Sequence, residues 1–104
     1  MNRTRGGPLR LVKSLRGEGT LMWGRGSARE VSYSIDLYGQ GPLLSGDGDV
    51  RGNLADLVGR SPANVRLRLA SGHEAPITLC GIEADSASID LVKPASPALF
   101  EDET

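Results

Sequence analysis

Cysteine and histidine are almost absent from this sequence, which contains Cys80 and His73 and no other residue of either type. One cysteine excludes an internal disulfide framework and is typical of a reducing compartment. One residue of each type gives a zinc site at most two of its usual ligands, so we expect no bound metal. The extended chain predicted between them spans roughly 23 Å at about 3.3 Å per residue, so we expect no Cys–His nucleophile pair either.

Long apolar runs are also missing. No run approaches the roughly 18 residues that a membrane helix requires, so we expect no membrane partner. The positively charged opening is not followed by the apolar segment of a secretion signal, which favours the cytoplasm. The 104 residues carry a net charge of −1, with 38 % hydrophobic and 24 % charged residues. This balance is ordinary for a soluble globular domain and unlike a strongly basic nucleic-acid binder.

Motifs for catalysis and for nucleotide binding are lacking too. No serine stands in a Gly-x-Ser-x-Gly elbow, and neither Gly-x-Gly-x-x-Gly nor a Walker sequence occurs. The segment 47–52 is similar to the start of an EF-hand loop, but Arg51 and Val58 stand where oxygen ligands belong. We therefore expect no catalytic residue, no cofactor and no metal site.

Alternation of apolar and polar residues is the main positive signal. Val31, Tyr33, Ile35 and Leu37 occupy every second position of 30–37, with polar residues between them. A strand places such residues on one face, whereas a helix would spread them around its circumference. This segment is therefore a predicted strand.

The same reasoning predicts further strands. They cover residues 16–23, 44–52, 64–69, 74–83 and 86–92. Residues 9–15 form either an earlier strand or a continuation of 16–23, and Gly81 interrupts the alternation of 74–83 as a bulge or bend would. Short links between strands predict hairpins and antiparallel neighbours.

One short segment, 53–59, is predicted to be helical. Asn53 is its expected N-cap, with Asp56 at the third helical position and Gly59 just beyond the end. Its apolar residues, expected on one buried face, are Leu54, Leu57 and Val58. Such a turn would close one end of a curled sheet.

These elements predict an all-β fold: a small antiparallel meander of 5–6 strands forming a closed or nearly closed barrel. A two-layer sandwich is the alternative. We expect one barrel domain over 9–92, a flexible basic N-terminus over 1–8 and a flexible acidic tail over 93–104. Within the tail, Leu99 and Phe100 are candidates for docking on the barrel or on a partner.

Glycine is concentrated on one face of the third predicted strand, at Gly46, Gly48 and Gly52. Glycines on an inner face suit a sharp bend or a bulky group lying across the strand, for which Trp23 and Tyr33 are candidates. A ligand resting on the bare backbone is the alternative. We therefore treat Gly46 and Gly48 as candidate binding residues.

Asp47 and Asp49 are expected side by side on the outer face of the same strand. Two carboxylates at this spacing could serve acid–base chemistry or hold a hard cation. The plainer interpretation is a solvated ladder in which Arg51, Arg66 and Arg68 are cross-strand partners.

Charge is distributed unevenly along the chain. Residues 1–29 hold seven basic residues and one acid, a net +6, whereas 30–104 hold five basic and twelve acidic residues, a net −7. The basic N-terminal residues that could contact nucleic-acid phosphates are Arg3, Arg5, Arg10, Lys13 and Arg16. Only 4 % of residues are aromatic, few for the stacking that single-strand binders use.

We conclude from the sequence that a non-catalytic binding or interaction module is the best description. Its partner would be a protein or a small ligand, with contact surfaces around 39–48 and around Arg66 and Arg68. Nucleic-acid binding through the basic N-terminal region is the alternative, and a carboxylate enzyme at Asp47 and Asp49 is a weaker third. The chain would be a monomer or a homodimer paired through a sheet edge.

Overall fold

The computed structural model describes residues 10–40, 43–92 and 99. The predictions for residues 1–8, which include Arg3 and Arg5, and for the tail other than Leu99, lie outside the described residues. The elements are β1 (Arg10–Trp23), β2 (Ser27–Gln40), β3 (Leu43–Arg51), the 3₁₀ turn η1 (Ala55–Leu57), β4 (Arg66–Arg68), β5 (Glu74–Cys80) and β6 (Ser86–Leu91). No helix in this part of the chain is long and apolar enough to cross a membrane.

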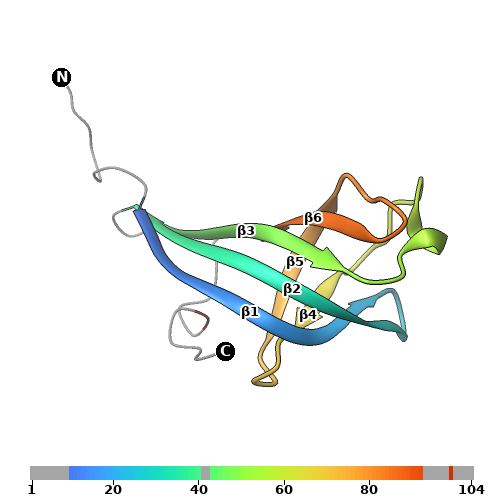
Figure 1. Cartoon of the computed structure of the whole chain (residues 1–104), viewed down its shortest axis with the longest axis horizontal. Coiled ribbons are helices and arrows are strands. Elements are labelled where there is room, and N and C mark those ends of the chain that lie inside the picture. The colour runs from blue at the N-terminus through green and yellow to red at the C-terminus, as the bar shows by residue number, and fades with distance from the viewer. Residues whose placement is uncertain (1–9, 41–42, 93–98, 100–104) are drawn as a thin grey trace.

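The strands form one closed antiparallel barrel in the order β1-β2-β3-β6-β5-β4, with β4 completing the circle against β1 (Figure 1). The predicted all-β barrel is therefore confirmed, and the sandwich alternative is wrong. The chain order differs from an uninterrupted meander, because β3 pairs with β6 and not with β4. The segment after β3 instead crosses toward β4, tied by Gly52 and Leu54 N–H groups to the carbonyls of Asp85 and Ala84.

Some strands are longer than predicted and others are shorter. Residues 10–15 continue the first strand, so β1 and β2 form one long hairpin of 14 residues on each side. β4 is shorter than predicted, since Asn64 takes a left-handed φ of 54° and the regular strand starts only at Arg66. β5 stops at Cys80, because Gly81 turns the chain with a φ of 60°.

The core follows the predicted alternation. Val31, Tyr33, Ile35 and Leu37 of β2 are all buried, and Ser32 on the opposite face is exposed. Burying a large aliphatic or aromatic side chain stabilises a fold by about 1.5–3 kcal/mol relative to exposing it. Leu99 also belongs to this core cluster, so of the two docking surfaces considered for it, the barrel and a partner, its side chain occupies the barrel.

The turn η1 closes one end of the barrel but is shorter than predicted. It covers only Ala55–Leu57, and Leu54, not Asn53, occupies the N-cap position without a side-chain cap. Leu54 and Leu57 are buried as expected, whereas Val58 is 49 % exposed and lies off the buried face. Leu54 and Leu57 are three residues apart and therefore share one side of the 3₁₀ turn, whereas Val58 follows the turn in an extended conformation with a ψ of 128°.

Packing explains the glycines of β3, but no aromatic ring is involved. A Cβ atom on Gly46 would lie 2.6 Å from Leu91 Cδ1, and one on Gly48 would collide with the backbone of Ser34 and Ile35. Tyr33 covers glycines of β1 instead: a Cβ on Gly17 would lie 3.0 Å from its Oη. The assignment of Trp23 or Tyr33 to the third strand was therefore wrong, and protein atoms fill the space where a ligand would rest.

Candidate functional site

The structure separates the two groups of predicted binding residues. Asp47 and Asp49 lie on the outer face of β3, and Gly46 and Gly48 alternate with them. Arg66 and Arg68 lie on β4, which neighbours β1 and β5 but not β3. The six residues therefore do not form one site.

The predicted cross-strand ladder of arginines and aspartates is wrong for all three arginines. Arg51 Nη2 lies 4.0 Å from Asp49 Oδ2, along the same strand and not across two strands. Arg68 instead forms an ion pair of 2.9 Å with Glu74, and Arg66 donates to the backbone carbonyl of Asn64. The roles of Arg66 and Arg68 as partners of the two aspartates were wrong, because the barrel closes with β6 between β3 and β5.

Strand register instead creates a row of carboxylates, which we call the acidic row: Asp36 of β2, Asp47 of β3 and Asp90 of β6. Asp47 is directly opposite Asp36 on one side and Asp90 on the other. Asp36 accepts a hydrogen bond of 2.7 Å from Ser14 Oγ, and Asp90 accepts a longer one from Cys80 Sγ. None of the three forms an ion pair with the residues that the structure describes.

A hollow of about 680 Å³ runs beside the acidic row, lined by Tyr38, Gly46, Asp47 and Asp90 among others. Burial, followed by the charges of Asp47 and Asp36, raises the pKa of the Tyr38 hydroxyl. Asp47 itself is exposed, so it lacks the water-poor surroundings that carboxylate acid–base chemistry needs. Within residues 10–40, 43–92 and 99, no group of three or more His, Cys, Asp or Glu side chains is placed to hold a metal.

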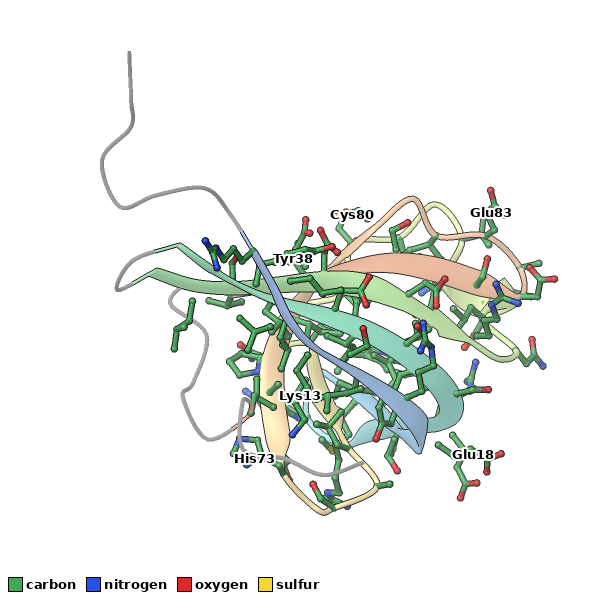
Figure 2. All side chains as sticks on the ribbon, turned by 60° about the vertical axis from the view of Figure 1, so that its left-hand side comes forward. Lys13, Glu18, Tyr38, His73, Cys80 and Glu83 are labelled. Atoms are coloured by element: carbon green, nitrogen blue, oxygen red, sulfur yellow. The ribbon has the colours of Figure 1, made fainter. Side chains whose placement is uncertain are left out.

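His73 and Cys80 lie far apart, as predicted. Figure 2 shows them at opposite ends of β5, with His73 beside the tight turn before the strand. Cys80 is exposed, and its Sγ donates a hydrogen bond of 3.6 Å to Asp90 Oδ2. Burial, together with the charge and hydrogen bond of Asp90, raises the pKa of its thiol, which disfavours the nucleophilic thiolate.

A larger hollow of about 890 Å³, which we call the Trp23 pocket, lies near the opposite end of β1. The turn between β1 and β2 forms one wall, and η1 with the segment after it forms the other; a bond from Gly24 N–H to the Ala63 carbonyl ties the walls together. The lining residues are Trp23, Gly26, Ser27, Ala28, Arg29, Asp56, Leu57, Arg60, Ser61 and Pro62.

Arg29 is held rigidly in this pocket. Its guanidinium donates to both carboxylate oxygens of Asp56, at 2.6 and 3.1 Å, and to the Asn53 carbonyl at 2.6 Å. The same group lies 5.5 Å from the centre of the Trp23 ring, in a cation–π contact. The hydrogen bond from Arg29 lowers the pKa of Asp56, and Asp56 in turn raises the pKa of Arg29.

Trp23 lies at the border between the core and the pocket. The side chain is only partly buried: it packs against the core cluster and also lines the pocket. The sequence could not place Trp23 in a pocket, because the other wall is formed by residues 56–62, which are distant from Trp23 along the chain. The alternation in β1 carried no information on residues 56–62.

Arg60 is the second cation of the pocket, and its side chain has no hydrogen-bond or ion-pair partner among the residues that the structure describes. With Arg29 and Asp56, it leaves the lining with one net positive charge. A neighbouring hollow of about 410 Å³, lined by both polar and apolar residues, shares Arg60, Ser61 and Pro62. The segment 60–62 therefore borders both hollows.

The basic residues proposed for nucleic acid are described only in part. Arg10, Lys13 and Arg16 lie along β1, and none forms an ion pair with the described part of the chain. Arg16 Nε donates to Ser34 Oγ at 3.2 Å. The three residues are thus cations without an ion pair among the described residues, and none of them lines the Trp23 pocket.

The Trp23 pocket is the candidate site with the most complete set of binding groups, since it combines a positioned aromatic ring, a cation without an ion pair among the described residues and the larger volume. The hollow beside the acidic row has no cation in its lining. No protein-family model, curated protein or solved structure matches this chain.

Proposed function

We propose that this protein is a non-catalytic binding module that holds a small organic anion with a planar apolar part in the Trp23 pocket. The observation that carries the proposal is the pairing of the Trp23 ring with Arg60, whose guanidinium has no hydrogen bond or ion pair with the described residues, in one hollow of about 890 Å³. Binding sites for small molecules commonly have volumes of about 300–1,000 Å³ and combine apolar walls with a few polar groups.

The two arginines have different roles in this proposal. Arg29 uses three of its five N–H donors on Asp56 and Asn53, and its charge is paired with Asp56, so its main role is to hold its guanidinium against the Trp23 ring. Arg60 is free to donate a charge-assisted hydrogen bond to a carboxylate or phosphate. A hydrogen bond to a charged group contributes about 1.5–3 kcal/mol. Ring stacking adds about 0.5–1.5 kcal/mol. Together they contribute about 2–4.5 kcal/mol, and the upper end of this range corresponds to a millimolar dissociation constant.

The chemistry of the pocket favours binding over catalysis. Its titratable carboxylate, Asp56, is neutralised by Arg29 and has a lowered pKa, so it is a poor proton acceptor. The lining contains no cysteine or histidine. The hydroxyls of Ser27 and Ser61 suit ligand positioning in such a site.

Fluorescence provides a direct test, because Trp23 is the one tryptophan of the sequence. The probes are benzoate and phenyl phosphate, with benzamide as the neutral match to benzoate. We expect a saturable change of emission with the two anions and none with benzamide, because Arg60 requires a negative charge.

The decisive variant is Arg60→Gln, with Arg51→Gln as the matched control. Both residues are exposed arginines, but Arg51 lies on β3 outside the pocket. We expect Arg60→Gln to weaken benzoate binding by about tenfold or more, while Arg51→Gln binds as the unchanged protein does. The proposal is wrong if neither anion gives a saturable signal, or if the two variants bind alike.

A further inference from the structure

The long strand β1 has a stretch without a neighbouring strand. On one side it pairs with β2 over its whole length, from Arg10 to Trp23. On the other side β4 pairs only with Thr20–Met22, and the backbone of Arg68 extends this contact to Gly19. Figure 1 shows β1, β2 and β3 running well beyond β4 at this end.

We call residues 10–16, on the side that faces away from β2, the β1 edge. The structure describes no strand that pairs with it. An unpaired edge presents N–H and C=O groups that can bind another extended chain. Exposed apolar side chains accompany these groups, since Leu11 is 59 % and Val12 is 55 % exposed. A register shift between Leu11 and Lys13 leaves Val12 without a partner residue on β2.

The charge of the β1 edge determines which chain it suits. Residues 10–16 contain Arg10, Lys13 and Arg16 and no acidic residue. The cations lie on both faces of the sheet, because Lys13 is opposite the buried Leu37 and Arg16 is opposite Ser34 on the outer face. None is neutralised by the described residues, so the edge carries three free positive charges.

A second copy of this chain is a poor occupant. Antiparallel pairing of two β1 edges around Lys13 would bring both basic stretches side by side, and like charges opposed across strands are destabilising. Basic residues on an edge are a common protection against such self-pairing. The same charges attract a strand of opposite sign.

We propose that the β1 edge binds an extended acidic segment of a partner protein, which adds to the barrel as a further strand. Main-chain hydrogen bonds to residues 10–16 would hold the segment, and its carboxylates would lie beside Arg10, Lys13 and Arg16. Leu11 and Val12 would contact apolar residues of the segment. This mode of binding takes its affinity from the backbone and its specificity from alternate side chains.

The experiment measures fluorescence anisotropy of a labelled peptide made of two Glu-Glu-Val-Val repeats, which places glutamate on both faces of a strand. We expect saturable binding to the full chain. We expect Lys13→Glu to weaken it by about tenfold, because reversing a charge opposes the carboxylates. Arg25→Glu is the matched control: Arg25 is an exposed arginine in the turn at the other end of β1, and its reversal should leave affinity unchanged.

Backbone pairing is tested separately from charge. The same peptide with every backbone amide N-methylated keeps its carboxylates but has no N–H donor on either edge, so we expect its binding to disappear. Equal binding of the two peptides would overturn strand addition. If a single-stranded oligothymidine binds and the peptide does not, the partner would be a nucleic acid and the proposed acidic protein segment would be wrong.

Two further outcomes would also overturn the proposal. The first is a dimer, seen by sedimentation, that Lys13→Glu strengthens, because the edge would then belong to a second copy. The second is peptide binding that occurs only when Glu101, Asp102 and Glu103 are replaced by their amides, because the chain's own acidic segment would then be the occupant. All of these readouts are independent of the Trp23 pocket, so either proposal can fail alone.

Discussion

The hydroxyl of Tyr33 accepts a hydrogen bond of 3.0 Å from the backbone N–H of Ala70. Tyr33 points from β2 across the glycines of β1 to reach the segment after β4. Gly17 and Gly19 make this path available, since a Cβ atom on either would press against the ring. Three segments distant in sequence therefore meet at one aromatic side chain.

Removing the hydroxyl with Tyr33→Phe should destabilise the fold. The Ala70 N–H would lose its partner in a partly buried position, which costs about 1–3 kcal/mol. Urea unfolding followed by Trp23 fluorescence measures the loss. Tyr38→Phe is the control, because the Tyr38 hydroxyl has no hydrogen bond to the described residues. An equal effect of the two variants would contradict the role assigned to the Tyr33–Ala70 bond.

Gly19→Ala should be more damaging than the same change at Gly39. A Cβ on Gly19 would collide with the backbone carbonyl of Arg68, so the contact between β1 and β4 must open. Overpacking of this kind costs about 1–3 kcal/mol. A Cβ on Gly39 would meet side-chain atoms alone: Val12 Cγ2 at 3.3 Å, which belongs to an exposed side chain and can move, and Leu44 Cδ2 at 3.9 Å, an ordinary contact. Urea midpoints of the two variants test this order.

The sequence predicted the barrel because the information lies within each strand. The alternation of Val31, Tyr33, Ile35 and Leu37 with polar residues predicts a strand with one buried face. Short links between strands predict antiparallel neighbours. The pairing of β3 with β6 is different in kind, because it depends on the path of residues 52–65. The strands β1–β3 and β4–β6 form two groups that can join into a barrel in more than one strand order. The alternation within each strand does not determine which order occurs.

The candidate site was missed for the same reason. Trp23, Arg29 and Arg60 come from the end of one strand, the start of the next and a loop, and only the closed barrel brings them together. The pair Asp47 and Asp49 could be identified in the sequence. That Asp36 and Asp90 lie opposite Asp47 follows only from the register of three strands. Residues on one strand are predictable from spacing, whereas a site between strands is not.

The Arg29–Asp56 pair should make stability depend on acidity. Arg29 holds the pKa of Asp56 below its ordinary value of 3.8, so the folded state binds the proton less readily than the unfolded chain does. The stabilisation is therefore complete above that ordinary value and is lost as pH falls through the lowered one. Asp56→Asn should reduce stability at pH 7 and show a smaller further loss in strong acid. Parallel urea titrations at pH 7 and at about pH 2.5 measure both effects.

Asp90→Asn should make Cys80 more reactive. The Asp90 charge and hydrogen bond contribute, after burial, to the raised pKa of the Cys80 thiol. Removing the charge increases the thiolate fraction near pH 8, and alkylation by neutral iodoacetamide should accelerate by about twofold or more. Asp85→Asn, an exposed change in the loop before β6, should leave the rate unaltered. A rate that Asp90→Asn leaves unchanged would remove Asp90 as a cause of the raised pKa.

Asp47→Asn should stabilise the protein. Asp47 lies between Asp36 and Asp90 in register, so one substitution removes two like-charge oppositions in the sheet. Such oppositions are destabilising by an amount on the order of 0.5 kcal/mol, and the urea midpoint should rise accordingly at low salt. The same substitution should lower the raised pKa of Tyr38, because the Asp47 charge is one of its causes. An ultraviolet titration of the tyrosines measures this second effect.

Asp49→Asn is the matched control for this last prediction, because it is the same chemical change two residues along the same face of β3. Asp49 lies opposite Ser34 and Ser88 and has Arg51 at 4.0 Å, so its neutralisation relieves no opposed carboxylate. We expect it to leave stability unchanged or slightly lower. The gain from Asp47→Asn should also shrink in about 1 M salt, where charges are screened beyond about 3 Å. A gain that salt leaves intact, or an equal gain from Asp49→Asn, would show that repulsion within the acidic row is not its source.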